Sequence, residues 1–210
     1  MIPVKICGIT NLKDALICVQ HGVSALGFIF APSKRQVDPE TVYQISRQLP
    51  PFIVKVGVFV NEDPLRIKDI LKDCRLDLAQ LHGQETPDDC ELLEGRVIKA
   101  FRAGHDLPDP IWREAALRGV LVDSYSSGSA GGTGRVFDWK LAEDYRQLGF
   151  PLILAGGLNA DNIEAAVRIV RPDGVDLSSG VELGPGHKDP EKLGKLMNGI
   201  RGKGQQGIRV

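Results

Sequence analysis

Short apolar, β-branched runs alternate eight times with longer segments of helical periodicity, and this alternation restricts the possible folds most strongly. The strand-like runs cover residues 4–9, 25–30, 52–60, 76–83, 96–103, 119–124, 151–157 and 174–180. Helices are predicted near 12–21, 39–49, 64–73, 86–94, 138–147, 159–170 and 189–200, with a weaker one near 110–118. Because a helical crossover returns the chain to the same end of a sheet, the pattern predicts parallel strands in an α/β protein.

Two architectures fit such a pattern, an open doubly wound sheet and a closed (β/α)8 barrel. In an open nucleotide-binding sheet the first strand would lead into a glycine-rich phosphate motif, and Cys7-Gly8-Ile9-Thr10 is not one. Eight regular units favour closure. We therefore predict a single-domain (β/α)8 TIM barrel over residues 1–201, followed by a flexible, glycine-rich tail at 202–210.

Composition excludes several classes of function. The 26 basic and 27 acidic residues nearly cancel, so no field gathers nucleic acid or an anionic membrane surface. The chain has no apolar stretch of membrane-spanning length and no pattern of a signal peptide at its start. Its four cysteines form no CxxC pair and have no zinc-ligand spacing, which predicts reduced thiols, no metal and a cytoplasmic location. Cys18, Cys74 and Cys90 are expected to serve packing.

Polar residues recur on one phase of several strands. Alternate side chains of a barrel strand face the helices and the interior. In four strands one phase is apolar, while the other holds Lys5 and Cys7, Gln80 and His82, Leu121 and Asp123, or Asp176 and Ser178. The apolar phase should face the helices, so these residues are predicted to point inward. Barrels keep their active sites at the C-terminal ends of the strands, where the later member of each pair lies.

Several motifs resemble the phosphoribosylanthranilate isomerase family of tryptophan biosynthesis. They are KICGIT (5–10), GVFVNE (57–62), LHG (81–83), VDSYS (122–126), GGTGRVFDW (131–139), LAGGLN (154–159), VRPDGVDLSSGVE (170–182) and PGHKD (185–189). The match runs in the family's order from residue 4 to about residue 189. The resemblance implies a barrel enzyme without metal or organic cofactor. It would catalyse the Amadori rearrangement of N-(5'-phosphoribosyl)anthranilate to 1-(o-carboxyphenylamino)-1-deoxyribulose 5-phosphate.

The resemblance assigns the two catalytic roles of this reaction. Opening the sugar ring needs a general acid, and moving the double bond needs a base that takes the proton from C2. Cys7 resembles the family's base and Asp123 its acid. A cysteine base should have a pKa below the usual value of about 8.5, and a carboxylic acid active near neutral pH should have a raised pKa. Without the motif, Cys7 would be read as a packed hydrophobe and Asp123 as a loop cap.

Phosphate binding is predicted after the last two strands. Gly156 and Gly157 end the seventh strand, Asn159 could cap the next helix, and Ser179 and Gly180 end the eighth strand. Glycine lets the backbone approach an oxyanion closely, and loops seven and eight are the usual phosphate site of this architecture. A glycine pair after a strand is often only a turn, but two such loops together favour phosphate.

Three further residues complete the expected site. Arg35 matches the family's ligand for the anthranilate carboxylate, because a guanidinium can pair with both carboxylate oxygens. His82 either lines the site or satisfies interior hydrogen bonds, and Asp176 supports the site or contacts a substrate hydroxyl. A buried ammonium is costly unless paired, so Lys5 is expected to form an ion pair with Asp176 or another interior acid beneath Cys7.

Some alternatives stay open at this point. Residues 124–135 are rich in glycine and serine, and they could form a lid or a plain connector. A neighbouring phosphosugar enzyme, indole-glycerol-phosphate synthase, would need a catalytic lysine and glutamate at strand ends, whereas Lys5 lies deep and Lys55 lies mid-strand. A family member that also accepts the related histidine-pathway aminoaldose, or a non-catalytic sensor, is also conceivable. The expected partner is the small phosphosugar substrate, and the sequence does not decide between a monomer and a homodimer.

Overall fold

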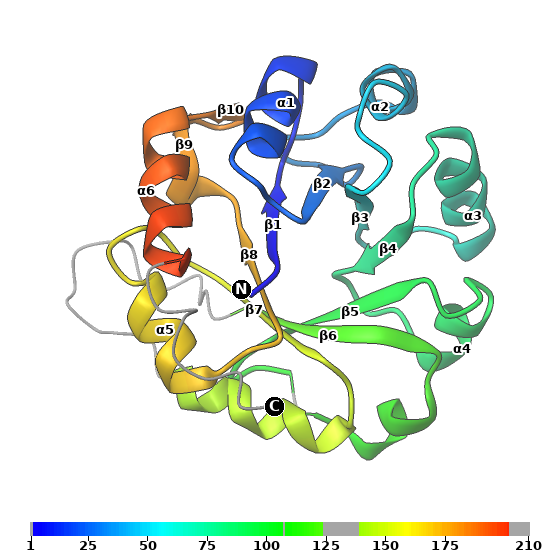
Figure 1. Cartoon of the computed structure of the whole chain (residues 1–210). Helices are drawn as coiled ribbons and strands as arrows, with labels where there is room; N and C mark the ends of the chain where they lie inside the picture. Colours follow the sequence, from blue (N-terminus) through cyan, green and yellow to red (C-terminus); the bar gives the residue numbers. More distant parts are fainter. Residues whose placement is uncertain (1, 107, 124–138, 202–210) are drawn as a thin grey trace.

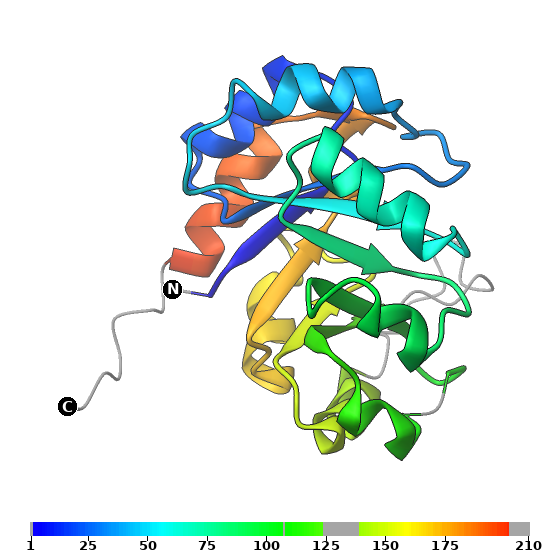
Figure 2. The same ribbon diagram turned by 90° about the vertical axis from the view of Figure 1, so that its right-hand side faces the viewer.

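The computed structural model describes residues 2–106, 108–123 and 139–201, and it shows a single domain built on a closed barrel. All eight barrel strands pair in parallel and in sequence order (Figure 1). They are β1 (Val4–Cys7), β2 (Ala25–Ile29), β3 (Val54–Phe59), β4 (Leu78–Leu81), β5 (Val97–Arg102), β6 (Leu117–Asp123), β7 (Leu152–Ala155) and β8 (Gly174–Leu177). In Figure 2 the blue strand β1 lies beside the orange strand β8, and this pair closes the barrel. The predicted (β/α)8 fold is confirmed.

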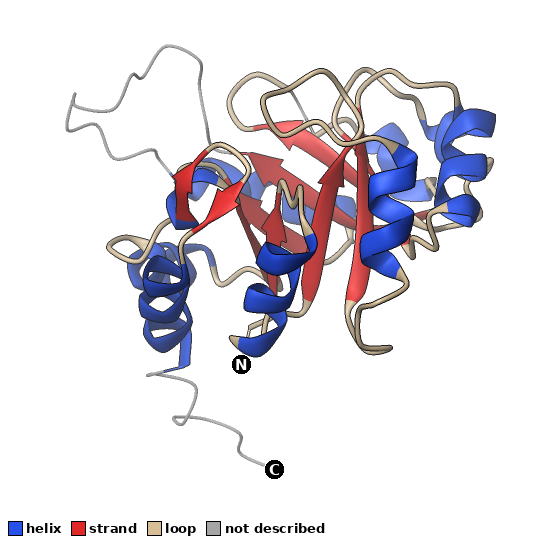
Figure 3. Ribbon diagram, turned by 90° about the horizontal axis from the view of Figure 1, so that it is seen from above, coloured by secondary structure: helices blue, strands red, loops and turns tan. Residues whose placement is uncertain are grey.

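Helices cover the outside of the barrel, as Figure 3 shows in blue around the red strands. They are α1 (Leu12–Gln20), α2 (Pro39–Ser46), α3 (Pro64–Asp73), α4 (Pro87–Glu91), α5 (Ile163–Val170) and α6 (Pro190–Arg201), with the 3₁₀ helices η1 (Pro110–Glu114), η2 (Trp139–Leu148) and η3 (Ser179–Val181). Most of the apolar core lies between this layer and the strands. Within the described residues, no helix combines the length and apolar character needed to cross a membrane.

The helices begin where the sequence places capping residues. The side chains of Asn11, Asp38, Asp63 and Thr86 accept hydrogen bonds from the first-turn amides of α1, α2, α3 and α4. The last three of these helices also have proline in the first turn, where its missing N–H costs no hydrogen bond. These local signals explain why the predicted starts of the first four helices agree with the structure to within one residue.

The later units differ from the prediction. The helix expected at 159–170 begins at Ile163, because the preceding residues form a turn with its own hydrogen bonds. In that turn Asn159 accepts from the amides of Asp161 and Asn162, and Asn162 accepts from the amide of Asn159. Asn159 therefore caps this turn and does not cap α5. The segments expected near 110–118 and 138–147 are 3₁₀ helices, η1 and η2.

A short antiparallel hairpin follows β8 and was not expected from the sequence. It consists of β9 (Glu182–Gly184) and β10 (His187–Lys188). The backbone carbonyl of Gly186, in its turn, accepts a 2.7 Å hydrogen bond from the hydroxyl of Thr10. The hairpin is thereby attached to the loop after β1, at the end of the barrel where that strand finishes.

Strand register confirms the predicted phase. Cys7 lies opposite Gly27, Gln80 opposite Ile98, and Leu121 opposite Ile153. Residues in register on neighbouring strands point to the same side of the sheet, so the predicted inward residues share the barrel interior. On the side of β5, β6 and β7 the interior is filled by an apolar cluster of Ile98, Ala100, Leu121 and Ala155. On the side of β1 and β8 it holds charged groups, because Lys5 is in register with Asp176. The barrel interior therefore holds an apolar cluster and a buried charged pair on different strands.

Two predicted features lie outside the described residues. The proposed lid at 124–135 belongs to the undescribed segment 124–138, and the predicted tail at 202–210 begins directly after α6. Both stay predictions.

Candidate active site

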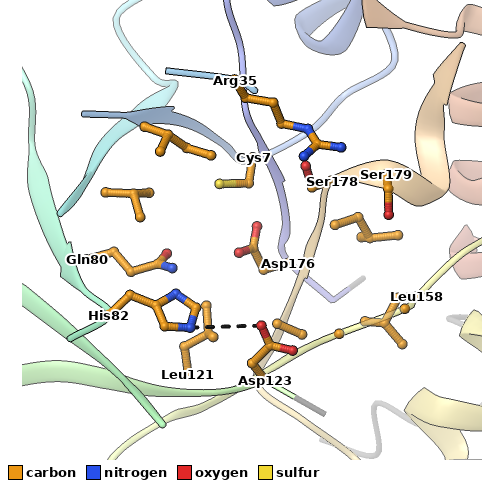
Figure 4. Close-up of a pocket in the computed structure, with 16 residues that line it drawn as sticks. Cys7, Arg35, Gln80, His82, Leu121, Asp123, Leu158, Asp176, Ser178 and Ser179 are labelled. Carbon is orange, nitrogen blue, oxygen red and sulfur yellow. Dashed lines mark ion pairs between the residues drawn. The ribbon is translucent and has the colours of Figure 1, made fainter. Parts of the chain in front are cut away.

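A cavity of about 350 Å³ opens at the C-terminal ends of the strands (Figure 4). Its lining comes from seven of the eight strands or the loops that follow them, and consists of Cys7, Ile29, Arg35, Val58, Gln80, His82, Leu121, Asp123, Ala155, Gly156, Gly157, Leu158, Asp176, Leu177, Ser178 and Ser179. All the residues predicted for the site line it, apart from Gly180. The closed barrel therefore brings together residues from sequence positions 7 to 179 in one cavity.

Cys7 lies on the cavity wall at the end of β1, beside the amine of Lys5. Space for both side chains comes from Gly27 of β2: a Cβ there would lie 2.9 Å from the Cys7 sulfur and 3.0 Å from the Lys5 nitrogen. Gly27 was not singled out from the sequence, because only the pairing of β1 with β2 places it opposite Cys7. A larger residue would displace the thiol or the amine.

The predicted ion pair between Lys5 and Asp176 is confirmed. The Lys5 Nζ donates a 2.9 Å hydrogen bond to Asp176 Oδ2, and both side chains are less than a tenth exposed. Burial alone would lower the pKa of Lys5, but the carboxylate of Asp176 and the neighbouring Cys7 raise it above the ordinary value. The amine is therefore a buried cation directly below the thiol.

The expected direction of the Cys7 pKa is wrong. Burial raises the pKa of the thiol above its ordinary value, and the negative charge of Asp176 adds to that effect. Lys5 and Lys188 lower it, but they do not offset the desolvation of a side chain that is 8% exposed. Cys7 is consequently a protonated thiol at neutral pH.

Asp123 and His82 face each other across the other side of the cavity. Figure 4 shows Cys7 and Asp123 on opposite sides, with Asp176 between them. The His82 Nε2 lies 3.9 Å from Asp123 Oδ2. Burial lowers the pKa of His82, although the carboxylates of Asp123 and Asp176 oppose that shift. His82 therefore lines the cavity, one of the two possibilities left open by the sequence, and its imidazole is neutral near pH 7. Its part in binding stays a prediction.

Arg35 reaches the cavity from the loop after β2. Its stem crosses the backbone at Gly8, where a Cβ would collide with the Arg35 Cδ, and Gly8 has a φ of +76° that favours glycine. Its guanidinium is not free for a ligand on all sides. Nε donates to both carboxylate oxygens of Glu182, at 2.9 and 3.1 Å, and Nη2 donates to Oε2 at 2.5 Å.

Glu182 and Lys188 are the charged residues near the site that the sequence reading missed. The Lys188 Nζ donates to Glu182 Oε1 at 2.7 Å and to the backbone carbonyl of Cys7 at 2.6 Å. Both side chains are buried, at 3% and 0% exposed. Burial would raise the pKa of Glu182, but hydrogen bonds from Arg35 and Lys188 hold it below the ordinary value, so it is a carboxylate at neutral pH. Glu182 is the last residue of the motif VRPDGVDLSSGVE, and Lys188 lies in PGHKD. Their positions in these motifs are the sequence signal that could have identified them as site residues.

The two predicted phosphate loops meet at the cavity wall. Gly156 and Gly157 have φ values of +91° and +62°, so the chain turns there in a conformation that side chains disfavour. Gly180 does not line the cavity; a Cβ on it would collide with the carbonyl oxygen of Leu158, so its role is to let loop eight pack closely on loop seven. Ser179, one residue earlier, lies on the cavity wall with Gly157.

Three side-chain atoms on the cavity wall have no hydrogen-bond partner among the described residues. They are Gln80 Oε1, Asp176 Oδ1 and Ser178 Oγ, all buried. Buried polar atoms are rarely left without a partner, so their presence together indicates a surface suited to a polar ligand. Gln80 and Ser178 were placed on the inward phase from the sequence but were given no role.

Other lysines are engaged outside the cavity. Lys55 forms an ion pair with Asp77 at 3.3 Å, and Lys99 donates to Glu85 at 2.8 Å and to the carbonyl of Gly83. Neither is among the residues that line the cavity. Within the described part of the chain, the lining therefore lacks the lysine that a decarboxylating ring closure would need.

Comparisons with known proteins show the family to which the chain is related. Residues 4–199 match the family described as N-(5'-phosphoribosyl)anthranilate (PRA) isomerase. The isomerase of Trichlorobacter lovleyi is 47% identical over 203 residues, which are 96% of this chain and 98% of that protein. A crystal structure of the isomerase with reduced 1-(o-carboxyphenylamino)-1-deoxyribulose 5-phosphate has a TM-score of 0.83 and 40% identity, and covers 96% of this chain and 100% of its own.

A further similar structure is of monomers generated from the dimeric isomerase of Thermotoga maritima. It has a TM-score of 0.82 and 39% identity, with 96% of this chain and 100% of that chain covered. The agreement extends over nearly the whole barrel in both sequence and structure. The chain therefore belongs to the N-(5'-phosphoribosyl)anthranilate isomerase family, an enzyme family of tryptophan biosynthesis, as its motifs predict.

Proposed function

We propose that the chain converts N-(5'-phosphoribosyl)anthranilate to 1-(o-carboxyphenylamino)-1-deoxyribulose 5-phosphate, with Asp123 as general acid and Cys7 as general base. The observation that carries this assignment is the cavity that holds both groups on opposite sides. The ring oxygen and the C2 proton of the substrate need an acid and a base at two positions, and a sugar between Cys7 and Asp123 offers one to each.

Asp123 acts in the first step, ring opening. Its carboxylic acid gives a proton to the ring oxygen while the bond between that oxygen and C1 breaks, and the lone pair of the anthranilate nitrogen forms a C=N bond to C1. Neutral His82, 3.9 Å from Asp123, adds no positive charge that would draw the proton off the acid.

Cys7 acts in the second step. Its thiolate takes the proton from C2, the electron pair of the C2–H bond forms the C1=C2 bond, and the π pair of the C1=N bond returns to the anthranilate nitrogen. The resulting enaminol loses its C2 hydroxyl proton and gains a proton at C1, which gives the ketone. Because burial raises the pKa of the thiol, the fraction of thiolate rises as the pH rises above neutral. The rate should therefore increase with pH on the acid side of its optimum. Lys5 and Lys188 oppose the effect of burial and keep the thiolate attainable.

Substrate binding is divided between two ends of the cavity. The phosphate lies in the nest formed by Gly156, Gly157 and Ser179, where loops seven and eight of a barrel usually hold it. The anthranilate carboxylate lies at Arg35. The sugar hydroxyls face the unpaired oxygen of Asp176 and its neighbours on the wall. These assignments follow the family resemblance and the position of each residue around the cavity.

A fluorescence assay tests the proposal. The purified chain receives freshly made phosphoribosylanthranilate, and the loss of substrate fluorescence is followed for the wild type, Cys7→Ala and Asp123→Asn. The wild type should turn over the substrate. Each variant should lose a factor of about 10² to 10⁴, the usual contribution of general acid or base catalysis. An unchanged rate in Cys7→Ala would remove Cys7 as the base, and an inactive wild type would remove the function.

We also propose a cytoplasmic location. Support comes from the four cysteines, which are buried free thiols rather than disulfides. Cell fractionation with an antibody to the chain tests this, and recovery in an exported fraction would contradict it.

A further inference from the structure

We propose that Glu182 is a positioning residue for substrate recognition: it holds the guanidinium of Arg35 so that only one end of it can receive the anthranilate carboxylate, and Lys188 keeps this cluster positive. The inference rests on the proposed function, because it needs a substrate with a carboxylate. It assigns roles to two residues beyond the acid, the base and the groups that bind substrate directly.

The hydrogen bonds define which part of the guanidinium is occupied. Glu182 accepts from Nε at 2.9 and 3.1 Å and from Nη2 at 2.5 Å, so its carboxylate covers the Nε–Nη2 edge of Arg35. A substrate carboxylate on that edge would have to displace a buried ion. The end formed by Nη1 and the outer hydrogen of Nη2 offers the remaining pair of parallel donors. Arg35 thus presents a fixed two-pronged end.

Charge explains why the cluster needs Lys188. The ion pair with Glu182 would by itself cancel the charge of Arg35 and remove its attraction for an anion. Lys188, with its side chain fully buried, lies 2.7 Å from Glu182 Oε1 and adds a second positive charge. The three groups together carry a net charge of about +1, from two cations and one anion, and this charge is held in low dielectric where it acts strongly.

The same cluster is joined to the candidate base. The Lys188 Nζ also donates to the carbonyl of Cys7 at 2.6 Å, and Glu182 Oε1 accepts from the amide of Gly186 at 3.3 Å. The hairpin that carries Glu182 and Lys188 is bonded to Thr10. Carboxylate recognition and the position of β1 therefore depend on one buried network, which fixes the distance between the aromatic end of the substrate and the thiol.

Two ligands isolate this role. One is the reduced product analogue, which bears the anthranilate carboxylate; the other is the same compound made with aniline, which lacks it. Dissociation constants are measured by calorimetry for the wild type and Glu182→Gln. The wild type should prefer the carboxylate analogue at least tenfold. Glu182→Gln should lose at least fivefold of this preference, because an amide offers one acceptor oxygen in place of two and no longer holds the guanidinium in place, and this loss outweighs the added attraction from removing a negative charge. The aniline analogue should bind within about twofold of wild type.

Glu85→Gln is the matched control. Glu85 is likewise a buried carboxylate paired with a lysine, Lys99, at 2.8 Å, but it lies away from Arg35. It should leave the ratio between the two analogues unchanged even where it lowers stability. In the Arg35→Met background, Glu182→Gln should cause no further loss of preference, because Glu182 acts only through Arg35.

Lys188→Met provides a second test if Glu182→Gln does not fold. It removes the second cation and should reduce the preference for the carboxylate several-fold. A Glu182→Gln or Lys188→Met protein that weakens both analogues equally, or keeps the full preference, would overturn the inference alone. A wild type that binds neither analogue would overturn the proposed function, and the inference with it.

Discussion

Replacing Lys5 with methionine should destabilise the protein strongly and in a pH-dependent way. Methionine keeps most of the side-chain volume and removes the ammonium 2.9 Å from Asp176 Oδ2. The other oxygen of Asp176 has no partner among the described residues, so the variant leaves a buried carboxylate with neither oxygen bonded. Breaking a buried ion pair from one side usually costs about 3–5 kcal/mol.

A second estimate gives a similar figure. The variant can avoid a buried, unpaired carboxylate by protonating Asp176. For a carboxyl with a normal pKa near 3.9, protonation costs about 1.4 kcal/mol for each pH unit above that value, which is roughly 5–6 kcal/mol at about pH 8. The loss of unfolding free energy near pH 8 should therefore be about 3–5 kcal/mol. By the same arithmetic it should shrink to about 1–2 kcal/mol near pH 5.

The sign follows from linkage. In the variant the folded pKa of Asp176 lies above its unfolded value, so the folded state binds the extra proton. Its stability is then greatest below the unfolded pKa and is lost as the pH rises through the folded pKa. In the wild type the pKa of Lys5 is raised, so the contribution of the ammonium persists to alkaline pH and is lost when the pH rises through that raised value. Burial also holds the pKa of Asp176 above its ordinary value, against the opposing charge of Lys5, so part of the stability is lost in the wild type as the pH rises through that value.

Urea unfolding between about pH 5 and pH 9 measures this difference. Lys99→Met, which breaks the buried pair with Glu85, is the control for the loss of a buried cation. Thiolate absorbance, taken as the difference from a Cys7→Ser protein, gives a second readout that belongs to Cys7 alone. The subtraction is needed because burial raises the pKa of Cys18 and Cys90 to about 12 and of Cys74 to about 11, so these thiols also titrate at high pH.

Lys5→Met should raise the pKa of Cys7 further, since the nearest cation is gone, whereas Lys99→Met should not. Adding Asp176→Leu to Lys5→Met should recover most of the stability, because an apolar pair leaves no buried charge. A Lys5→Met protein as stable near pH 8 as the wild type, with an unmoved Cys7 titration, would refute this reasoning.

Three further outcomes are expected. Gly180→Ala should lower the free energy of unfolding, measured by thermal unfolding, by about 1–3 kcal/mol, because its Cβ would collide with the Leu158 carbonyl oxygen. It should also weaken binding of the phosphate-bearing product analogue. Unchanged binding would contradict the proposed packing of the two loops. Gly8→Ala should lower the free energy of unfolding by about 1–2 kcal/mol, because Gly8 has a positive φ. The new Cβ should also displace Arg35 and reduce the preference for the carboxylate analogue over the aniline analogue, measured as above. Burial would raise the pKa of Glu85, but the hydrogen bond from its buried partner Lys99 lowers it, so the ionised Glu85 stabilises the fold above the unfolded pKa of about 4.3 and this stabilisation is lost as the pH falls. In urea unfolding, the free energy of unfolding of Glu85→Gln should therefore fall less steeply below about pH 5 than that of the wild type. An identical fall in both proteins would contradict the assignment.

The barrel could be predicted because its signals are local and repeated. Strand alternation fixes which side chains share a face, so the inward position of Lys5 followed from the apolar character of Val4 and Ile6 beside it. Closure then placed Lys5 in register with Asp176, as expected for the first and last strands. The motif residues at the strand ends meet in one cavity for the same reason.

Other features depend on contacts that no local pattern contains. Glu182 and Lys188 lie in a hairpin after the last strand, and only closure of the barrel brings them to Arg35 and the carbonyl of Cys7. The pKa of Cys7 depends on the balance between burial and two lysines, and the sequence reading counted nearby charge but not the degree of burial. The late start of α5 reflects competing side-chain bonds, whose strength the capping pattern at Asn159 does not reveal.

The assignment of Cys7 as base and Asp123 as acid is tested most directly by a hydrogen isotope effect at C2 of the ribose. Single-turnover rates are measured with protium and deuterium at that carbon for Cys7→Ser and Asp123→Asn. We predict a primary isotope effect in Cys7→Ser, where proton abstraction becomes limiting, and none in Asp123→Asn, where ring opening becomes limiting. An isotope effect in Asp123→Asn with none in Cys7→Ser would contradict the assignment.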